Sequence, residues 1–215
     1  EVRRMGELAA IGQLAASIAH ELRNPLSSIK GAAQFLSSEL SDPADREFLN
    51  IIIEEVDGLN RIASEFLDFA RPLKLEVSEV RPSELLDRGR ARVASQLTEA
   101  GIECSVIVDE GTPSLLADAR QLEQVLLNLI LNAVQAMPEG GTLELGARRS
   151  ANWPDCVELW VRDTGCGIPA DRLERIFTPF FTTKVKGTGL GLPVVQKIVQ
   201  NHGGHIAVES VEGEG

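Results

Sequence analysis

The chain has 215 residues, of which 43% are hydrophobic and 25% charged, and its formal net charge is −11. This composition is typical of a protein with a buried core, arranged as one large domain or two modest ones. The negative charge argues against nucleic-acid binding, because nucleic-acid phosphates would be repelled. No run of about 18 apolar residues is present to span a membrane.

The three cysteines, Cys104, Cys156 and Cys166, lack CxxC spacing. They indicate neither a disulfide framework nor a zinc site, and they suit a reducing cytoplasm. The sequence has no signal peptide or initiator methionine, and its first residues already follow a helical pattern. We therefore expect a cytoplasmic fragment of a longer protein, in which only upstream regions would contact a membrane.

Residues 1–71 predict a helical hairpin. Apolar residues at alternating spacings of three and four mark the first helix: Leu8, Ile11, Ala15, Ile18, Leu22, Ile29 and Leu36. Turn residues break the pattern before Pro43, and the spacing then resumes at Leu49, Ile52, Val56, Leu59, Ala63 and Phe66. Two such helices carry more apolar surface than they can cover alone, which predicts a homodimer with a four-helix bundle.

Residues 72–215 predict an α+β sandwich. Helices are expected at 82–100, 118–137 and 192–201, and a glycine-rich loop at 163–191. Strands are expected at 73–77, 102–108, 114–117, 141–149, 156–162 and 206–208.

His20 lies in the first helix, within the stretch Ser17-Ile18-Ala19-His20-Glu21-Leu22-Arg23-Asn24-Pro25-Leu26. With Ala15, Leu22 and Ile29 as heptad a positions, His20 occupies an f position, far from the apolar seam. The register therefore predicts an exposed imidazole. Taken alone, it indicates only a solvated histidine.

Two asparagines, Asn128 and Asn132, stand four residues apart on the helix expected at 118–137. Their amides therefore share one helix face, while leucines and isoleucines fill the others. Amides on an otherwise apolar helix are costly to bury unless something hydrogen-bonds to them. The pair indicates either a ligand site or two ordinary surface asparagines.

Two glycine-rich segments follow. In Asp163-Thr164-Gly165-Cys166-Gly167, the glycines allow close backbone approach and the carboxylate can accept a hydrogen bond from an exocyclic amine. Gly187-Thr188-Gly189-Leu190-Gly191 opens the last helix, whose N-terminus favours phosphate. It lacks both the GK[ST] ending of a P-loop and the βαβ context of a dinucleotide fingerprint. Each segment alone is also compatible with a simple turn.

In this order and spacing, the segments resemble the boxes of the sensor histidine kinases of bacterial two-component systems. The corresponding H, N, G1, F and G2 boxes are His20–Leu26, Asn128–Asn132, Asp163–Gly167, Phe177–Lys184 and Gly187–Gly191. The resemblance covers nearly the whole chain and is closest to a nitrogen-regulation-like branch, with Asn132-Ala133-Val134-Gln135-Ala136-Met137 closing the N-box helix. It implies a dimerisation and phosphotransfer hairpin (1–71), forming a dimeric four-helix bundle, followed by a Bergerat-type ATP-binding sandwich (72–215).

The resemblance also implies a nucleotide site. ATP would lie between the N-box helix and the glycine-rich lid, with Asp163 accepting the adenine amino proton. Asn128 would help to hold Mg²⁺, and Asn132 would contact phosphate. Lys184 is the lid candidate for stabilising charge on the γ-phosphate. The other implied nucleotide-binding residues are Gly165, Gly167, Thr183, Lys186, Gly187, Thr188, Gly189, Leu190 and Gly191.

By the same resemblance, His20 would attack the γ-phosphate through one ring nitrogen while Glu21 orients the other. Asn24, one turn further on, would orient water for dephosphorylating the partner. The implied function is ATP-dependent autophosphorylation on His20, followed by transfer to an aspartate of a response-regulator receiver domain. Phosphatase activity toward that partner is left open.

Two alternatives remain. An ATPase of the same nucleotide-binding fold, such as a chaperone or mismatch-repair relative, would carry a glutamate where this chain has Gln124. A non-catalytic dimeric scaffold would leave the intact boxes unexplained. Gln135 departs from the basic residue that many relatives carry after the second asparagine. His202 and His205 match no box and are predicted to be surface or packing residues.

Overall fold

The structure, a computed structural model, describes residues 24–40, 42–70, 74–153, 155–184 and 187–215. It divides into two compact units. The first contains Glu1–Pro72 and Thr182–Leu190, and the second contains Leu73–Phe181 and Gly191–Gly215. The expected domain boundary between residues 71 and 72 stays a prediction.

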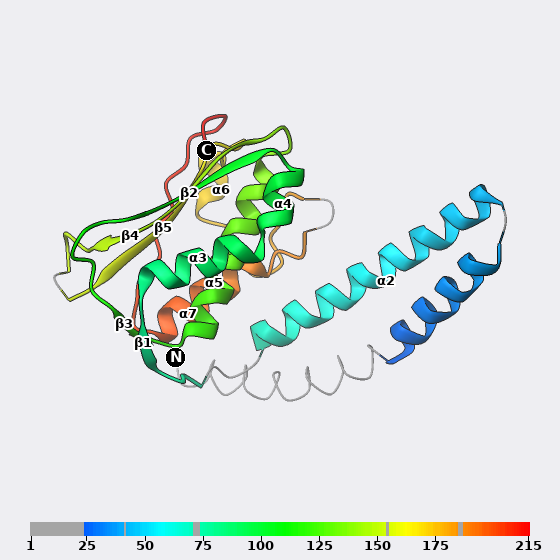
Figure 1. Cartoon of the computed structure of the whole chain (residues 1–215), viewed down its shortest axis with the longest axis horizontal. Coiled ribbons are helices and arrows are strands. Elements are labelled where there is room, and N and C mark those ends of the chain that lie inside the picture. Colours follow the sequence, from blue (N-terminus) through cyan, green and yellow to red (C-terminus); the bar gives the residue numbers. More distant parts are fainter. Residues whose placement is uncertain (1–23, 41, 71–73, 154, 185–186) are drawn as a thin grey trace. The chain divides into compact units, whose positions relative to one another are not determined.

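The first unit contains the predicted helical hairpin. Residues 24–39 form one helix, and α2 (Pro43–Ala70) runs antiparallel beside it (Figure 1). Asp42 starts α2, because its carboxylate accepts the backbone N–H of Ala44 at 2.9 Å. Lys30 on the first helix and Asp57 on α2 form an ion pair at 2.7 Å. The predicted pair of helices is therefore confirmed over the described residues.

One apolar stripe of the hairpin remains exposed in the single chain. Its side chains are 42% to 68% exposed and come from both helices: Ile29, Phe35, Leu36, Phe48, Ile51, Ile52, Leu59 and Ile62. Four of them, Ile29, Leu36, Ile52 and Leu59, belong to the predicted heptad seam. An apolar stripe of this extent is a surface that soluble proteins ordinarily cover.

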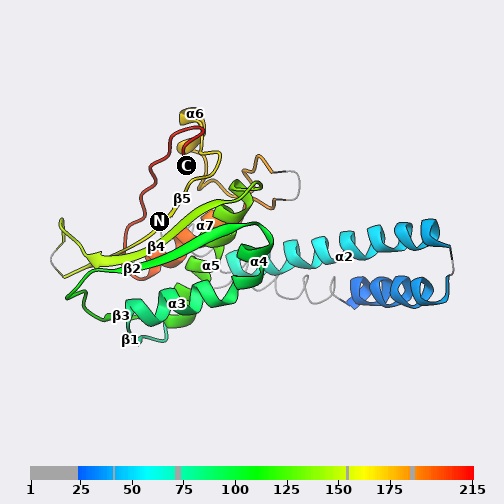
Figure 2. The ribbon, with the colours of Figure 1, turned by 45° about the horizontal axis from the view of Figure 1, so that its top comes forward.

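The second unit is a sheet covered on one face by helices (Figure 2). Strand β2 (Ile102–Val108) pairs in parallel with β4 (Gly141–Arg149), which pairs antiparallel with β5 (Val157–Asp163). A smaller sheet pairs β1 (Ser78–Val80) with β3 (Leu115–Ala117). The helices are α3 (Pro82–Arg92), α4 (Ala94–Glu99), α5 (Ala119–Ala136), α6 (Ala170–Leu173) and α7 (Gly191–Asn201).

The core of this unit lies between the sheet and the helices. Along β4 the buried side chains alternate with polar ones, as expected for a strand with one covered face. Helix α5 contributes a stripe at helical spacing, formed by Leu122, Leu126, Ile130 and Ala133. The α+β fold class predicted from hydrophobic periodicity is confirmed.

Three expected elements are wrong in detail. Residues 74–77 belong to no strand, and β1 begins only at Ser78. The N–H of Glu76 instead donates to the Asp118 carboxylate at 3.0 Å, a side-chain partner that no strand pattern reveals.

The helix expected at 82–100 divides at Val93, which has φ −113° and ψ 13° and a fully buried side chain. Residues 206–208 form no strand and belong to neither of the two sheets. Within the described ranges, none of the helices combines the length and hydropathy that crossing a bilayer requires.

Asp118 fixes the start of α5. Its Oδ1 accepts the backbone N–H groups of Arg120 and Gln121 at 3.0 and 3.1 Å, as an N-cap residue does. Burial alone would raise the pKa of Asp118. The N–H donors of Glu76, Gln121 and Arg120, together with the Gln121 side chain, outweigh burial and hold this pKa below its ordinary value.

We predict that Asp118→Asn lowers the free energy of unfolding by about 1–2 kcal/mol at neutral pH, because one amide oxygen cannot replace two carboxylate oxygens. A carboxylate whose pKa is lowered by folding stabilises the protein above its ordinary pKa, and this contribution is lost as the pH falls through the lowered value. The difference between the two proteins should therefore shrink on acidification below about pH 4.

Urea unfolding measured at pH 7 and at pH 3 checks this prediction. Asp155→Asn, in an exposed loop, is the control and should leave stability unchanged. An Asp118→Asn defect of equal size at both pH values would contradict the capping role of the carboxylate.

Candidate functional site

Helix α5 presents its two asparagines away from the core. Asn128 and Asn132 are half-buried, whereas Leu126 and Ile130 on the opposite side are 2% and 0% exposed. The Nδ2 group of Asn128 donates to the carbonyl oxygen of Gly191, the first residue of α7, at 3.4 Å. The predicted shared face is therefore present, and it lies beside the start of the last helix.

Asp163 ends β5 and begins the first glycine-rich segment. Its Oδ1 accepts the N–H of Gly165 at 3.0 Å, which fixes the orientation of the carboxylate. Gly165 is buried against the end of α5. A Cβ atom there would lie 2.7 Å from the Cβ and 2.8 Å from the carbonyl oxygen of Ala136.

The same carbonyl of Ala136 accepts the N–H of Cys166 at 3.1 Å. The loop that carries Asp163 is therefore held against the helix that carries the two asparagines. This contact places an amide pair and a carboxylate on one rigid framework within the second unit.

The other side of this loop is closed by the last residues of the chain. Gly167 has φ +65°, and a Cβ atom there would lie 2.1 Å from the carbonyl oxygen of Val211. The N–H of Ile168 donates to Ser210 Oγ at 2.8 Å. Glycine is therefore required at residue 167 both by its backbone conformation and by close packing.

The predicted lid residues belong to the first unit. The Thr182 hydroxyl accepts the N–H of Lys184 at 3.1 Å, and a Cβ atom on Gly187 would lie 2.4 Å from that hydroxyl oxygen. The Thr188 hydroxyl donates to the carboxylate of Glu65 on α2.

The remaining described lid residues differ in exposure. Thr183 and Lys184 are exposed, and Leu190 is fully buried. Gly189 has φ +68°, which suits glycine.

The F-box segment contains a strained residue. Phe180 has φ +66° and is 63% exposed, although bulky residues rarely adopt positive φ. The neighbouring Phe181 ring lies 4.4 Å from the Arg175 guanidinium carbon, within range of a cation–π contact.

The hairpin part of the predicted site is described only in part. His20 and Glu21 lie outside the described residues, as does Lys186 of the lid. Asn24 is the first described residue of the first helix and is exposed, and its carbonyl accepts the Ser28 hydroxyl at 3.2 Å.

Sequence reasoning gave no role to two residues that build this site. Ala136 is one, because its small side chain and its carbonyl receive the glycine loop. Thr164 is another: its Oγ1 accepts the N–H of Thr142 at 3.0 Å and lies 3.8 Å from the sulfur of buried Met137. The sequence shows that Ala136 is small, but its size alone does not predict which segment it contacts.

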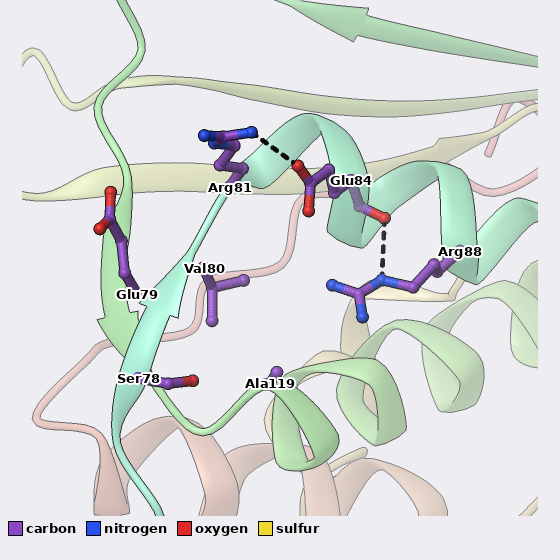
Figure 3. A pocket seen from close by; sticks show the side chains of 7 residues that line it. All are labelled: Ser78, Glu79, Val80, Arg81, Glu84, Arg88 and Ala119. Carbon is purple, nitrogen blue, oxygen red and sulfur yellow. Dashed lines mark hydrogen bonds and ion pairs between the residues drawn. The ribbon is translucent and has the colours of Figure 1, made fainter.

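A separate hollow of about 380 Å³ lies between β1, α3 and the start of α5 (Figure 3). Arg81 Nη1 and Glu84 Oε1 form an ion pair at 3.0 Å beside it, and Arg88 Nε donates to the Glu84 carbonyl at 3.2 Å. Among the described residues, those predicted to contact the nucleotide do not line this hollow.

Comparison with known proteins gives the class to which this arrangement belongs. Residues 117–215 match the family described as histidine kinase-, DNA gyrase B-, and HSP90-like ATPase. Residues 10–73 match the His Kinase A (phospho-acceptor) domain. The two matches define a phosphoacceptor hairpin followed by an ATPase-type sandwich.

Individual relatives narrow this class. Sensor histidine kinase ZraS of Escherichia coli K12 is 41% identical over 216 residues, which cover 100% of this chain and 46% of that protein. Full-length ShkA in complex with AMPPNP is 30% identical with a TM-score of 0.79, covering 94% of this chain and 43% of that one.

Histidine kinase ThkA in complex with response regulator protein TrrA is 30% identical with a TM-score of 0.64, covering 95% of this chain and 59% of that one. The catalytic domain of ThkA alone is 30% identical with a TM-score of 0.53, covering 64% of this chain and 89% of that one. The chain belongs to the sensor histidine kinases of two-component systems. The chain spans about half the length of ZraS.

We predict that Gly165→Ala destabilises the second unit by about 1–3 kcal/mol. The new Cβ atom would overlap the Cβ and carbonyl oxygen of Ala136, and the backbone of neither segment can easily shift to relieve the overlap. Chemical denaturation measures this loss. Cys166→Ala is the control at the next position; because that side chain is exposed, it should change stability by less than about 0.5 kcal/mol. Equal stability of Gly165→Ala and the unaltered chain would show that the loop and α5 are not in firm contact.

Proposed function

We propose that the chain is the catalytic core of a protein-histidine kinase that phosphorylates His20 with ATP and passes the phosphoryl group to a response-regulator aspartate. One observation carries this proposal: Asn128, Asp163 and Gly191 lie in the same unit, and that unit has an ATPase-family fold. The sequence around His20, within the matched phosphoacceptor domain, supplies the nucleophile.

Asp163 is proposed to recognise adenine. Its Oδ1 is engaged by Gly165, so Oδ2 is the oxygen that would accept the adenine amino proton. Asn132 would contact phosphate from the same face of α5. Gly187, Gly189 and the start of α7 at Gly191 would allow the lid backbone to approach the phosphates.

The remaining nucleotide contacts are assigned by analogy with the family. Lys184 would stabilise charge on the γ-phosphate. The other residues proposed to bind the nucleotide are Gly165, Gly167, Thr183, Lys186, Thr188 and Leu190.

Asn128 fits the role of a Mg²⁺ ligand. Because its Nδ2 donates to Gly191, Oδ1 is the atom that would face a metal. The described residues contain no cluster of three or more His, Cys, Asp or Glu that could hold a metal. The ion would therefore be held mainly by phosphate oxygens and water, as Mg²⁺ commonly is, and it would neutralise phosphate charge.

In the proposed reaction, one ring nitrogen of neutral His20 attacks the γ-phosphorus. A nitrogen–phosphorus bond forms as the bond to the β,γ-bridging oxygen breaks, and ADP leaves. Glu21 would accept a hydrogen bond from the other ring N–H and stabilise the positive charge that develops on the imidazole. Asn24, exposed at the start of the described helix, would orient water when the partner is dephosphorylated.

Two protein partners are proposed. A receiver domain of a response regulator would accept the phosphoryl group, as the ThkA–TrrA complex suggests by analogy. A second copy of this chain would cover the exposed apolar stripe of the hairpin and complete a four-helix bundle. The charge of −11 gives no support for a nucleic-acid partner.

The competing function is ATP hydrolysis without protein phosphorylation. The ATPase family that matches residues 117–215 allows it. Hydrolysis requires a base to activate water, and glutamine at residue 124 cannot act as one. The phosphoacceptor domain would also be left without a role, so we favour the kinase.

We predict that His20→Gln abolishes incorporation of label from γ-labelled ATP with Mg²⁺, because the amide is not a nucleophile. In the unaltered chain the label should be acid-labile and alkali-stable. Asn24→Ala, one turn away, is the matched control and should retain autophosphorylation. Undiminished labelling of His20→Gln would reject His20 as the phosphoacceptor.

We predict that Asp163→Asn weakens ATP binding by about tenfold or more while the protein stays folded, because the amide no longer offers two acceptor oxygens. Calorimetric titration with Mg·ATP measures the affinity, and circular dichroism verifies the fold. Asp171→Asn on α6, an exposed position, is the control. Unchanged affinity in Asp163→Asn would remove the proposed adenine contact.

A further inference from the structure

His202, immediately beyond the end of α7, makes more contacts than a surface or packing residue needs. It is half-buried, and its Nε2 lies 3.0 Å from the backbone nitrogen of Asp118. Its Nδ1 lies 2.8 Å from the carbonyl oxygen of Ile198. A backbone N–H can only donate, so Nε2 accepts and Nδ1–H donates, which defines one neutral tautomer of the imidazole.

The Asp118 end of this bridge is itself firmly held. Asp118 is 6% exposed, and its Oδ2 accepts the N–H of Glu76 and the side-chain amide of Gln121, both at 3.0 Å. The Gln121 side chain also donates to the Lys74 carbonyl at 3.1 Å. His202 therefore attaches the end of α7 to the fixed start of α5.

A second contact joins the start of α7 to the middle of α5. Helices α5 and α7 lie side by side (Figure 1), and Asn128 Nδ2 donates to the Gly191 carbonyl at 3.4 Å. At about 1.5 Å of rise per residue, both ties are separated by about 15 Å of helix. The similar spacing fits two antiparallel helices, with α7 joined at its two ends to the start and the middle of α5.

We propose that His202 is a positioning residue that sets the axial register of α7 against α5 and thereby holds Gly191 opposite Asn128. The inference rests on the proposed function, in which Asn128 and Gly191 belong to the nucleotide site. His202 lies about 15 Å along the helices from these residues and would act through the helix pair. A residue that only filled space would be replaceable by an apolar side chain, whereas this role requires an acceptor at the position of Nε2.

Three variants of His202 separate these roles. His202→Gln places an amide oxygen near the position of Nε2, so it should preserve the bridge. His202→Asn is polar but too short to reach Asp118, and His202→Leu keeps bulk without an acceptor. His205→Gln is the matched control, because His205 is exposed three residues away.

The first measurement is amide hydrogen exchange of the full chain without nucleotide. We expect exchange in α7 to accelerate by about fivefold or more in His202→Asn and His202→Leu, relative to β4, because local opening of α7 loses one of its two anchors. His202→Gln and His205→Gln should match the unaltered chain.

The second measurement is the affinity for Mg·ATP at a temperature where every variant is folded. His202→Asn and His202→Leu should bind about fivefold to tenfold more weakly, and His202→Gln within about twofold of the unaltered chain. If His202→Leu fails to fold, the comparison of His202→Asn with His202→Gln decides the question.

The proposal is overturned if His202→Asn shows unchanged exchange in α7, or if His202→Gln loses as much affinity as His202→Asn. Failure of the unaltered chain to bind ATP would instead reject the proposed function. The exchange measurement would still test the register of the two helices in that case.

Discussion

The structure depends above all on how α5 is held at its two ends. At its start, the buried carboxylate of Asp118 accepts hydrogen bonds from the first free N–H groups of the helix. It also accepts the N–H of Glu76, in the segment that leads into the second unit. At its end, the carbonyl and methyl group of Ala136 receive the glycine loop that follows β5. The helix is therefore a fixed platform, and its half-buried asparagine amides keep a defined position relative to Asp163.

This platform explains how mostly neutral residues could serve phosphoryl transfer. The reaction needs little covalent chemistry from the protein beyond the nucleophile, and depends mainly on position and on neutralising phosphate charge. Asn128, Asp163 and Gly191 share one unit, while the lid segment Thr182–Leu190 belongs to the unit that also contains the hairpin. The lid is continuous in sequence with α7, which begins at Gly191, so the register of α7 bears directly on where the lid ends.

Periodicity and capping were sufficient to predict most of the fold. The heptad spacing located the hairpin, and alternating residues located β2 and β4 with the bounds that the structure shows. Asp118 at a cap position located the start of α5. These features depend on neighbours in the sequence, which is why they are visible there.

Features that depend on distant residues were missed. The alternating pattern of residues 74–77 predicts a strand, but the N–H of Glu76 donates to the carboxylate of Asp118, forty-two positions away. Val93 turns its side chain into the core and so divides a helix that was expected to be continuous. The contacts of Ala136 with the glycine loop and of His202 with α5 arise only when separate elements pack. Candidate residues for the nucleotide site could be recognised in the sequence, because glycines and paired amides are unusual on apolar elements.

The most direct test of the central claim is to locate the phosphoryl group after the chain has reacted with Mg·ATP. Peptides prepared under alkaline conditions, where a phosphorylated imidazole survives, can be sequenced by mass spectrometry. Our account predicts one modified residue, His20, with ADP formed in equal amount. Release of inorganic phosphate without any phosphorylated peptide would contradict it and would identify the chain as a simple ATPase.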